Sequence, residues 1–197
     1  KAKEKIVVMP IADIKETFYV RVSLDEDRVS YFKKLYEAEH EVPPLEVTED
    51  GQLVDGRHRK AALTRMDRKE VKCKLSKNRT HPELIFDAFL ANFGGALPPS
   101  QSDINHTIKL LLANGVSRLK IVQHLSEATN LPAGMWRRMV DAMRLRLHSE
   151  KVGKARDAIA DRGLSVKEAA EEFKIEPDVL QKVVRGSKKS AGELNFR

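Results

Sequence analysis

Four short apolar or alternating runs mark the first eighty residues, and turn residues separate them. The runs lie at residues 6–9, 45–47, 52–54 and 71–75. Short runs of this kind, bounded by Gly, Pro or Asp, are typical of strands. Apolar residues recur at three-to-four spacing after the acidic cluster at residues 25–27, and alanines follow Gly56, which predicts two helices between the strands. The pattern predicts a small mixed α/β domain of the α+β kind over residues 1–80.

The strand signal disappears beyond residue 80, and helical spacing replaces it. Helices are predicted at residues 81 to about 92, at 104–113, from Ser117 onward, and from Pro132 to about Leu147. Two helices joined by a short turn, the second of them basic, fit a helix-turn-helix unit. An ordinary helical bundle with basic solvent-facing surfaces fits the spacing equally well. Of the two, we predict an all-α helix-turn-helix DNA-binding domain at residues 81–150.

A second helix-turn-helix-like unit is predicted over residues 151–186. Ser165 is placed to cap the first of its two short helices. The second begins with Glu176 and Asp178, whose charges would repel phosphates. We therefore expect this unit to serve packing or protein contact. The polar composition of residues 187–197 predicts a flexible tail.

Positive charge is concentrated in two zones of the chain. The net charge is +7 and the isoelectric point is about 9.5. Residues 57–79 carry ten Lys and Arg against two acids, and residues 118–156 carry nine against three. A solvated basic surface would explain one such zone. Two zones with motifs inside them favour a polyanionic partner.

The composition also excludes several classes of site. Cys73 is the only cysteine, which excludes an internal disulfide and a multi-cysteine zinc site, and its inward position in a strand predicts a small buried residue. The six histidines show no metal-binding spacing, so no protein-built metal site is predicted. Since no apolar run approaches the roughly 20 residues that span a bilayer and we see no charged-then-apolar leader, we expect a cytoplasmic protein with no membrane partner.

The stretch from Leu53 to Leu63, LVDGRHRKAAL, combines a strand end with a helix start. A strand that stops at Gly56 and turns directly into a helix leaves unpaired backbone N–H groups at the start of that helix. Arg57, His58 and Arg59 stand beside those groups. The stretch therefore predicts an anion-binding site.

The string PPLEVTEDGQLVDGRHRKAAL, preceded by MPIADI and the isolated Arg21, resembles the N-terminal domain of the ParB and sulfiredoxin superfamily. The resemblance covers roughly residues 5–80, and a helix-turn-helix at residues 102–147 would continue it as in ParB-type DNA-binding proteins and related transcriptional regulators. It implies a protein of the nucleoid or a plasmid that binds double-stranded DNA, in plasmid or chromosome partition or in transcription regulation. It also implies a homodimer and a ParA-type ATPase partner.

A phosphate site is implied by the same resemblance. In ParB proteins the arginines of a GERR motif grip CTP, and Gly56 and Arg59 match that motif here. His58 stands in place of its first Arg, and Arg57 in place of its Glu. A second motif with Glu, Asn and Arg holds phosphate and magnesium in ParB proteins, and only Asn92 matches it. The implied cofactor is CTP with Mg²⁺, and the implied nucleotide- or phosphate-binding residues are Arg21, Gly56, Arg57, His58, Arg59 and Asn92.

The second motif departs from the ParB pattern at its Glu and at its Arg, because glycines occupy the region of that Arg. Ala91 replaces its Glu, and this loss of a carboxylate argues against magnesium-dependent hydrolysis. The regulator branch resembles DGxHR followed by Asn-x-x-His-Gly-Leu-Pro, and residues 92–98 read NFGGALP, without the His.

The predicted DNA contacts lie in the helical domain. They are Arg118, Lys120, Ala133, Gly134, Arg137, Arg138 and Arg144. The basic side chains would contact phosphate or guanine, and the two small residues would allow close approach to the groove.

Enzymatic members of the superfamily supply the alternatives. Sulfiredoxins carry a reactive cysteine inside the motif, and Arg57 occupies that place here, which excludes their chemistry. A small-molecule kinase or a nuclease is the remaining alternative. Asp55 is the only acid within the motif, so neither has a pair of carboxylates for a base or a metal. We predict a DNA-binding protein without catalytic residues, with CTP hydrolysis as the possible exception.

Overall fold

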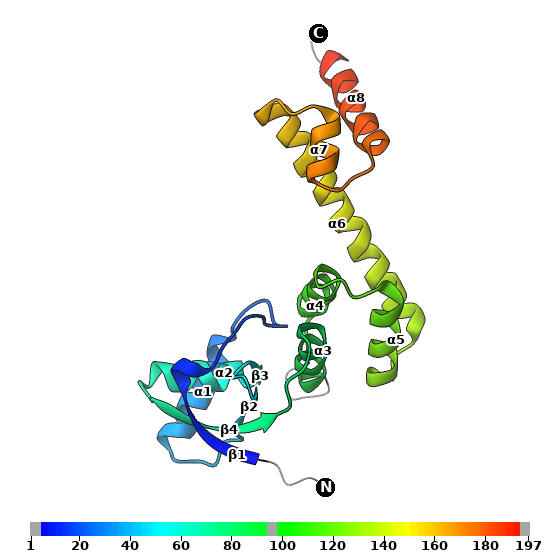
Figure 1. The fold of residues 1–197 in the computed structure, drawn as a ribbon. Helices are drawn as coiled ribbons and strands as arrows, with labels where there is room; N and C mark the ends of the chain where they lie inside the picture. The colour runs from blue at the N-terminus through cyan, green and yellow to red at the C-terminus, as the bar shows by residue number, and fades with distance from the viewer. Residues whose placement is uncertain (1–4, 94–97, 194–197) are drawn as a thin grey trace. The chain divides into compact units, whose positions relative to one another are not determined.

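The computed structural model describes residues 5–93 and 98–193, which form helices and one small sheet (Figure 1). The chain divides into two compact units, residues 1–140 and residues 141–197. Each unit has a buried apolar cluster of its own. None of the helices within the described residues is both long enough and apolar enough to cross a bilayer.

A four-stranded mixed sheet forms the base of the first unit. Its strands are β1 (Lys5–Pro10), β2 (Leu45–Thr48), β3 (Leu53–Asp55) and β4 (Glu70–Ser76), in the order β1-β4-β2-β3. Strand β4 pairs antiparallel with β1 and parallel with β2, whereas β2 and β3 form an antiparallel hairpin. The four predicted strands are confirmed.

One face of this sheet is buried because apolar residues alternate along its strands. Leu45, Val47, Leu53 and Cys73 form its centre together with Ile14. Cys73 is fully buried, and burial raises the pKa of its thiol. It is the small buried residue that its position in the strand predicts.

The two helices predicted between the strands are also confirmed. Helix α1 (Glu26–Glu37) begins at Asp25, whose carboxylate accepts the backbone N–H of Arg28 at 3.0 Å. Helix α2 (Arg57–Arg65) follows β3 after the single residue Gly56 and packs against α1. A short 3₁₀ turn, η1 (Ile11–Asp13), follows β1.

Three further helices belong to the first unit: α3 (His81–Asn92), α4 (Gln101–Ala113) and α5 (Arg118–Thr129). Helix α4 begins three residues before the predicted start, because Ser100 and Asp103 form a capping box. Helix α3 packs on β3 and on α4. Compactness therefore groups these helices with the sheet, although the sequence pattern changes at residue 80. A functional boundary at that residue stays a prediction.

Helix α6 (Ala133–Arg162) is longer than the sequence pattern predicts. It runs over 30 residues and does not end near Leu147. Between residues 147 and 162 the chain has no proline and one glycine, Gly153, so nothing there stops a helix. The division between the two compact units, at residue 140, falls inside this helix.

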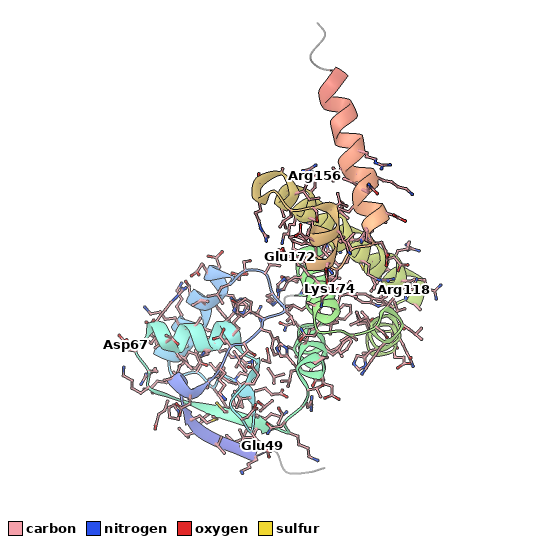
Figure 2. The ribbon with its side chains drawn as sticks, turned by 45° about the horizontal axis from the view of Figure 1, so that its top comes forward. Glu49, Asp67, Arg118, Arg156, Glu172 and Lys174 are labelled. Carbon is pink, nitrogen blue, oxygen red and sulfur yellow. The ribbon has the colours of Figure 1, made fainter. Side chains whose placement is uncertain are left out.

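The second unit contains the rest of α6 with α7 (Val166–Glu172) and α8 (Pro177–Glu193). Ser165 caps α7, as predicted. Glu172 and Lys174 lie at the turn between α7 and α8 (Figure 2). The buried cluster of the unit comprises Val152, Ala155, Ala169, Ala170, Ile175 and Leu180. Helix α8 continues across most of residues 187–197, for which composition predicts a flexible tail, while residues 194–197 lie outside the described residues.

Candidate functional site

A cavity of about 520 Å³ lies in the first unit, where β3 turns into α2. Its walls come from residues 16–21, α1, the β2–β3 hairpin, the first turn of α2, and the end of α3. This volume is typical of small-molecule sites, which measure about 300–1,000 Å³. All six residues predicted to bind phosphate or nucleotide line the cavity: Arg21, Gly56, Arg57, His58, Arg59 and Asn92.

Gly56 shapes the turn that opens this cavity. Its backbone lies in the left-handed region, with φ +107° and ψ 23°. A Cβ atom at this position would lie 2.5 Å from the Leu45 side chain and 3.1 Å from the Arg59 guanidinium. Glycine is required here because any side chain would meet both strain and overlap.

The first turn of α2 is free of capping side chains. Gly56 is the N-cap residue and has no side chain to accept the exposed N–H groups, and the first turn carries no acid. Helix α2 has nine residues, so its N-terminal N–H groups and dipole offer a positive end at the cavity. The predicted anion geometry is therefore present at the strand-to-helix turn.

Arg57 and Arg59 have different surroundings. Arg57 donates to the Arg21 carbonyl at 3.1 Å, lies 3.7 Å from the Glu16 carboxylate, and covers the Tyr19 ring with its guanidinium carbon 3.9 Å from the ring centroid. Arg59 donates to the Asp55 carboxylate at 2.7 Å and to the carbonyls of Pro43 and Pro44 at 2.7 and 2.8 Å. Three acceptors thus hold the Arg59 guanidinium, so this side chain fixes the wall of the cavity.

Arg21 joins the cavity to α3 and α4. Its guanidinium donates to Asn92 Oδ1 at 3.0 and 3.1 Å and lies 3.7 Å from Asp103. Burial lowers the pKa of Arg21, and the charge of Asp103 opposes that shift. Burial also raises the pKa of Asp103, but the N–H groups of Val22 and Ser100 and the charge of Arg21 hold it below its ordinary value. An ionised pair therefore anchors this part of the wall.

His58 is a neutral residue of the wall. Its Nε2 accepts the backbone N–H of Asp25 at 3.1 Å, so the hydrogen bond requires an unprotonated Nε2. Burial lowers the pKa of His58, and the charges of Arg21 and Arg28 lower it further. His58 thus links the start of α1 to the start of α2 and brings no positive charge to the cavity.

Arg28 and Lys74 also line the cavity, and no motif in the sequence indicates either of them. Arg28 comes from the first turn of α1 and Lys74 from β4. Glu16, Glu46 and Asp55 are the acids of the same wall, against Arg21, Arg28, Arg57, Arg59 and Lys74. The cavity is therefore cationic on balance, and it is suited to an anion.

Metal ligands are not clustered in this cavity. Within the described residues, no group of three or more His, Cys, Asp and Glu side chains is arranged to hold a metal ion. Asp55 is paired with Arg59, and Glu16 with Lys60 at 2.7 Å. These acids are therefore paired with cations of the protein and are poorly placed to hold an ion such as Mg²⁺.

Six of the seven residues predicted to contact DNA lie at the starts of α5 and α6, and Arg144 lies further along α6. Lys120, Arg137 and Arg138 are exposed, and Arg118 is half-buried. Ala133 and Gly134 are exposed in the first turn of α6, and a Cβ atom added at Gly134 would meet nothing within 4 Å. Arg144 is exposed too, but it belongs to the second unit.

Comparison with known proteins identifies the fold. Neither a protein-family model nor a curated protein matches the sequence. One match is a solved structure of a pNOB8-like ParB N-domain, with a TM-score of 0.55 at 14% sequence identity. The match covers 96% of this chain and 82% of the chain in that structure. A second structure of that domain matches 90% of this chain and 73% of its own, with a TM-score of 0.54 at 16% identity. The chain therefore has the mixed α/β fold of these ParB N-domain structures, which is the fold that the resemblance implies.

A third solved structure is more distant. It is a C-terminally truncated chromosome-partitioning protein ParB from Caulobacter crescentus, complexed with CTP-γ-S. It matches 91% of this chain and 98% of its own, with a TM-score of 0.42 at 13% identity. The fold assignment rests on the first two structures.

Proposed function

We propose that this protein is a nucleotide-responsive, ParB-like DNA-binding protein whose cavity in the first unit binds CTP. One observation carries the proposal: the six residues implied by the motifs come from three distant parts of the sequence and line one cavity. Positions 21, 56–59 and 92 belong to a loop, a strand-to-helix turn and a helix end. Such convergence of anion-binding groups supports a ligand site.

Different residues of the cavity would have different roles in binding a nucleotide. The N–H groups at the start of α2 would donate hydrogen bonds to a phosphate, since no side chain caps them. Arg21 and Arg57 would add positive charge, whereas Arg59 supports the turn through Asp55 and two carbonyls. Arg59 is given the supporting role because three acceptors hold its guanidinium.

DNA binding is supported by the shape and charge of the first turns of α5 and α6. The connection between them is only Asn130 to Pro132, as in a helix-turn-helix. Trp136 is fully buried, and its indole N–H donates to the Thr129 hydroxyl at 3.2 Å, which fixes the start of α6 against the end of α5. The exposed Arg137 and Arg138 follow directly from this anchored turn.

The cellular role comes from the resemblance alone. Partition of a plasmid or chromosome and regulation of transcription remain the two uses of such a protein, in the cytoplasm and on DNA. A homodimer and a ParA-type ATPase partner are further predictions of the same kind. The enzymatic alternatives gain no support, because Asp55, the acid in the motif, is held by Arg59.

Calorimetry with CTP, ATP, GTP and UTP, with and without duplex DNA, tests the nucleotide site. We expect CTP to bind and Arg57→Gln to weaken it about tenfold or more, because a charge-assisted hydrogen bond contributes about 1.5–3 kcal/mol. Arg65→Gln is the matched control: Arg65 lies on the same helix, pairs with Glu26, and does not line the cavity. If none of the four nucleotides binds, the nucleotide part of the proposal is overturned.

A further inference from the structure

Arg28 is a cation of the cavity that lies outside both phosphate motifs. Its backbone N–H is bonded to the Asp25 carboxylate at the start of α1, which fixes where the side chain leaves the helix. The side chain is half-buried, lines the cavity, and lies over the Phe32 ring with its guanidinium carbon 5.7 Å from the ring centroid. Aromatic packing therefore positions this guanidinium at the cavity.

The other arginines of the wall each lie close to a carboxylate. Arg59 is 2.7 Å from Asp55, and Arg57 and Arg21 are each 3.7 Å from an acid, Glu16 and Asp103. Arg28 forms no ion pair with an acid among the described residues. Within the described part of the chain, it is thus the arginine of the cavity wall that has no carboxylate partner in an ion pair.

One positive group, Arg21, and the neutral imidazole of His58 interact with Arg28 across the cavity wall. The positive charge of Arg28 lowers the pKa of both Arg21 and His58, after the larger effect of burial, so the three groups are electrostatically coupled. His58 uses Nε2 to accept the Asp25 N–H and stays neutral. A half-buried cation beside another cation is unfavourable without an anion, and a bound anion would remove that repulsion.

We propose that Arg28 binds the phosphate chain of the ligand and supplies, from α1, the positive charge that His58 does not supply from the motif. The ligand class is a polyphosphate, because Arg28 and the α2 N-terminus lie on different elements of one cavity and would hold different phosphates of a chain. This inference rests on the proposed nucleotide site and adds a residue to it. Arg28 would also tie α1 to the bound ligand.

The test is a titration of the full chain with CTP, CDP, CMP and tripolyphosphate at several salt concentrations. Arg28→Met keeps the apolar stem against Phe32 and removes the charge, and Arg28→Lys restores a charge without the planar fork. We expect Arg28→Met to weaken CTP and tripolyphosphate about tenfold or more and CMP much less, with a shallower salt dependence. Arg28→Lys should recover part of the loss.

Lys33→Ala on the same helix is the control, because Lys33 is exposed and pairs with Glu37. Thermal unfolding of each variant checks that the fold is kept. Unchanged CTP affinity and salt dependence in Arg28→Met, with CTP binding to the unaltered protein, would overturn the inference and leave the proposed site standing. If only tripolyphosphate binds and Arg28→Met weakens that binding, the result would support the role of Arg28 in binding phosphate. It would also contradict the proposal that the ligand is a nucleotide. No binding of any of the four ligands would overturn both.

Discussion

Gly56 shows how one residue can decide whether a site forms. Its φ of +107° is unfavourable for any residue with a side chain, and the nearest atom to a new Cβ is Leu45 Cδ2 at 2.5 Å. We expect Gly56→Ala to lower the free energy of unfolding by about 1–2 kcal/mol for the backbone and about 1–3 kcal/mol for overpacking. Chemical denaturation measures the loss, and a CTP titration should show weaker binding.

Gly115→Ala is the matched control for that substitution. Gly115 also has a positive φ, +76°, but a Cβ atom there would meet nothing within 4 Å. We expect only the backbone cost and no effect on CTP binding. Equal destabilisation by the two substitutions would contradict the role given to the Leu45 contact.

His58 makes stability depend on pH. Burial holds its pKa in the folded protein below the ordinary 6.5, with Arg21 and Arg28 adding to the shift. Between these two pKa values the unfolded chain binds a proton that the folded chain does not bind. The contribution of His58 to stability is therefore full above pH 6.5 and is lost as the pH falls toward the folded pKa.

His58→Gln should flatten this dependence, because glutamine can accept the Asp25 N–H and takes up no proton. Urea denaturation at a series of pH values between about 4.5 and 8 measures it, in the range around the ordinary histidine pKa. His40→Gln, at an exposed histidine, is the control and should keep the profile of the unaltered protein. A slope that persists in His58→Gln would assign the pH dependence to other groups.

At the scale of elements, helix starts provide both candidate binding regions. The start of α2 forms one wall of the cavity, and the start of α6 carries Arg137 and Arg138. Each start is fixed by buried neighbours: His58 bonds to the start of α1, and Trp136 packs edge-on against Phe89 of α3 at 6.3 Å. Well-anchored helix ends can present donors and charges without losing much conformational entropy on binding.

The paired change Arg137→Ala and Arg138→Ala tests the role of α6. We expect at least about a tenfold loss of affinity for duplex DNA, and a slope of log affinity against log salt that is smaller by about two if both contact phosphate. Fluorescence anisotropy at several salt concentrations measures both quantities. Lys33→Ala with Lys34→Ala removes the same charge from exposed positions of α1 and is the control. If the slope of log affinity against log salt is unchanged, these arginines do not contact DNA phosphates.

At the scale of the whole molecule, the two compact units have separate buried clusters. Leu180 is fully buried in the cluster of the second unit, whereas Trp136, the only tryptophan, is fully buried in the first. Leu180→Ala should destabilise the second unit by about 2–5 kcal/mol through loss of packing. Circular dichroism should then show an earlier loss of part of the helix signal.

Tryptophan fluorescence should not follow that earlier transition, because the environment of Trp136 lies in the first unit. CTP binding should also be retained, since all residues of the cavity precede residue 140. A single transition seen equally by both signals, shifted by Leu180→Ala, would show that the two units unfold together.

Much of this molecule is determined by local sequence. The four strands and the strand-to-helix turn at Gly56 follow from period-two patterns and from the residues that end them, because burial of one sheet face requires that period. The six residues predicted to bind phosphate follow from motif resemblance, and all six line the cavity. The length of α6 does not follow, since a helix with no proline and only the glycines Gly134 and Gly153 gives no local signal of where it should end.

Tertiary structure alone decides what each side chain does. The sequence indicates positive charge at residues 57–59. In the fold, however, Arg59 donates to Asp55 and to two carbonyls, and His58 stays neutral. The fold also brings Arg28 from α1 into the same wall, where no motif predicts it. The physical reason is that the pKa of a polar group, its partners and its remaining hydrogen-bonding capacity depend on burial and on neighbours that are distant in sequence. Local patterns determine the elements, and only their packing determines the charges of the site.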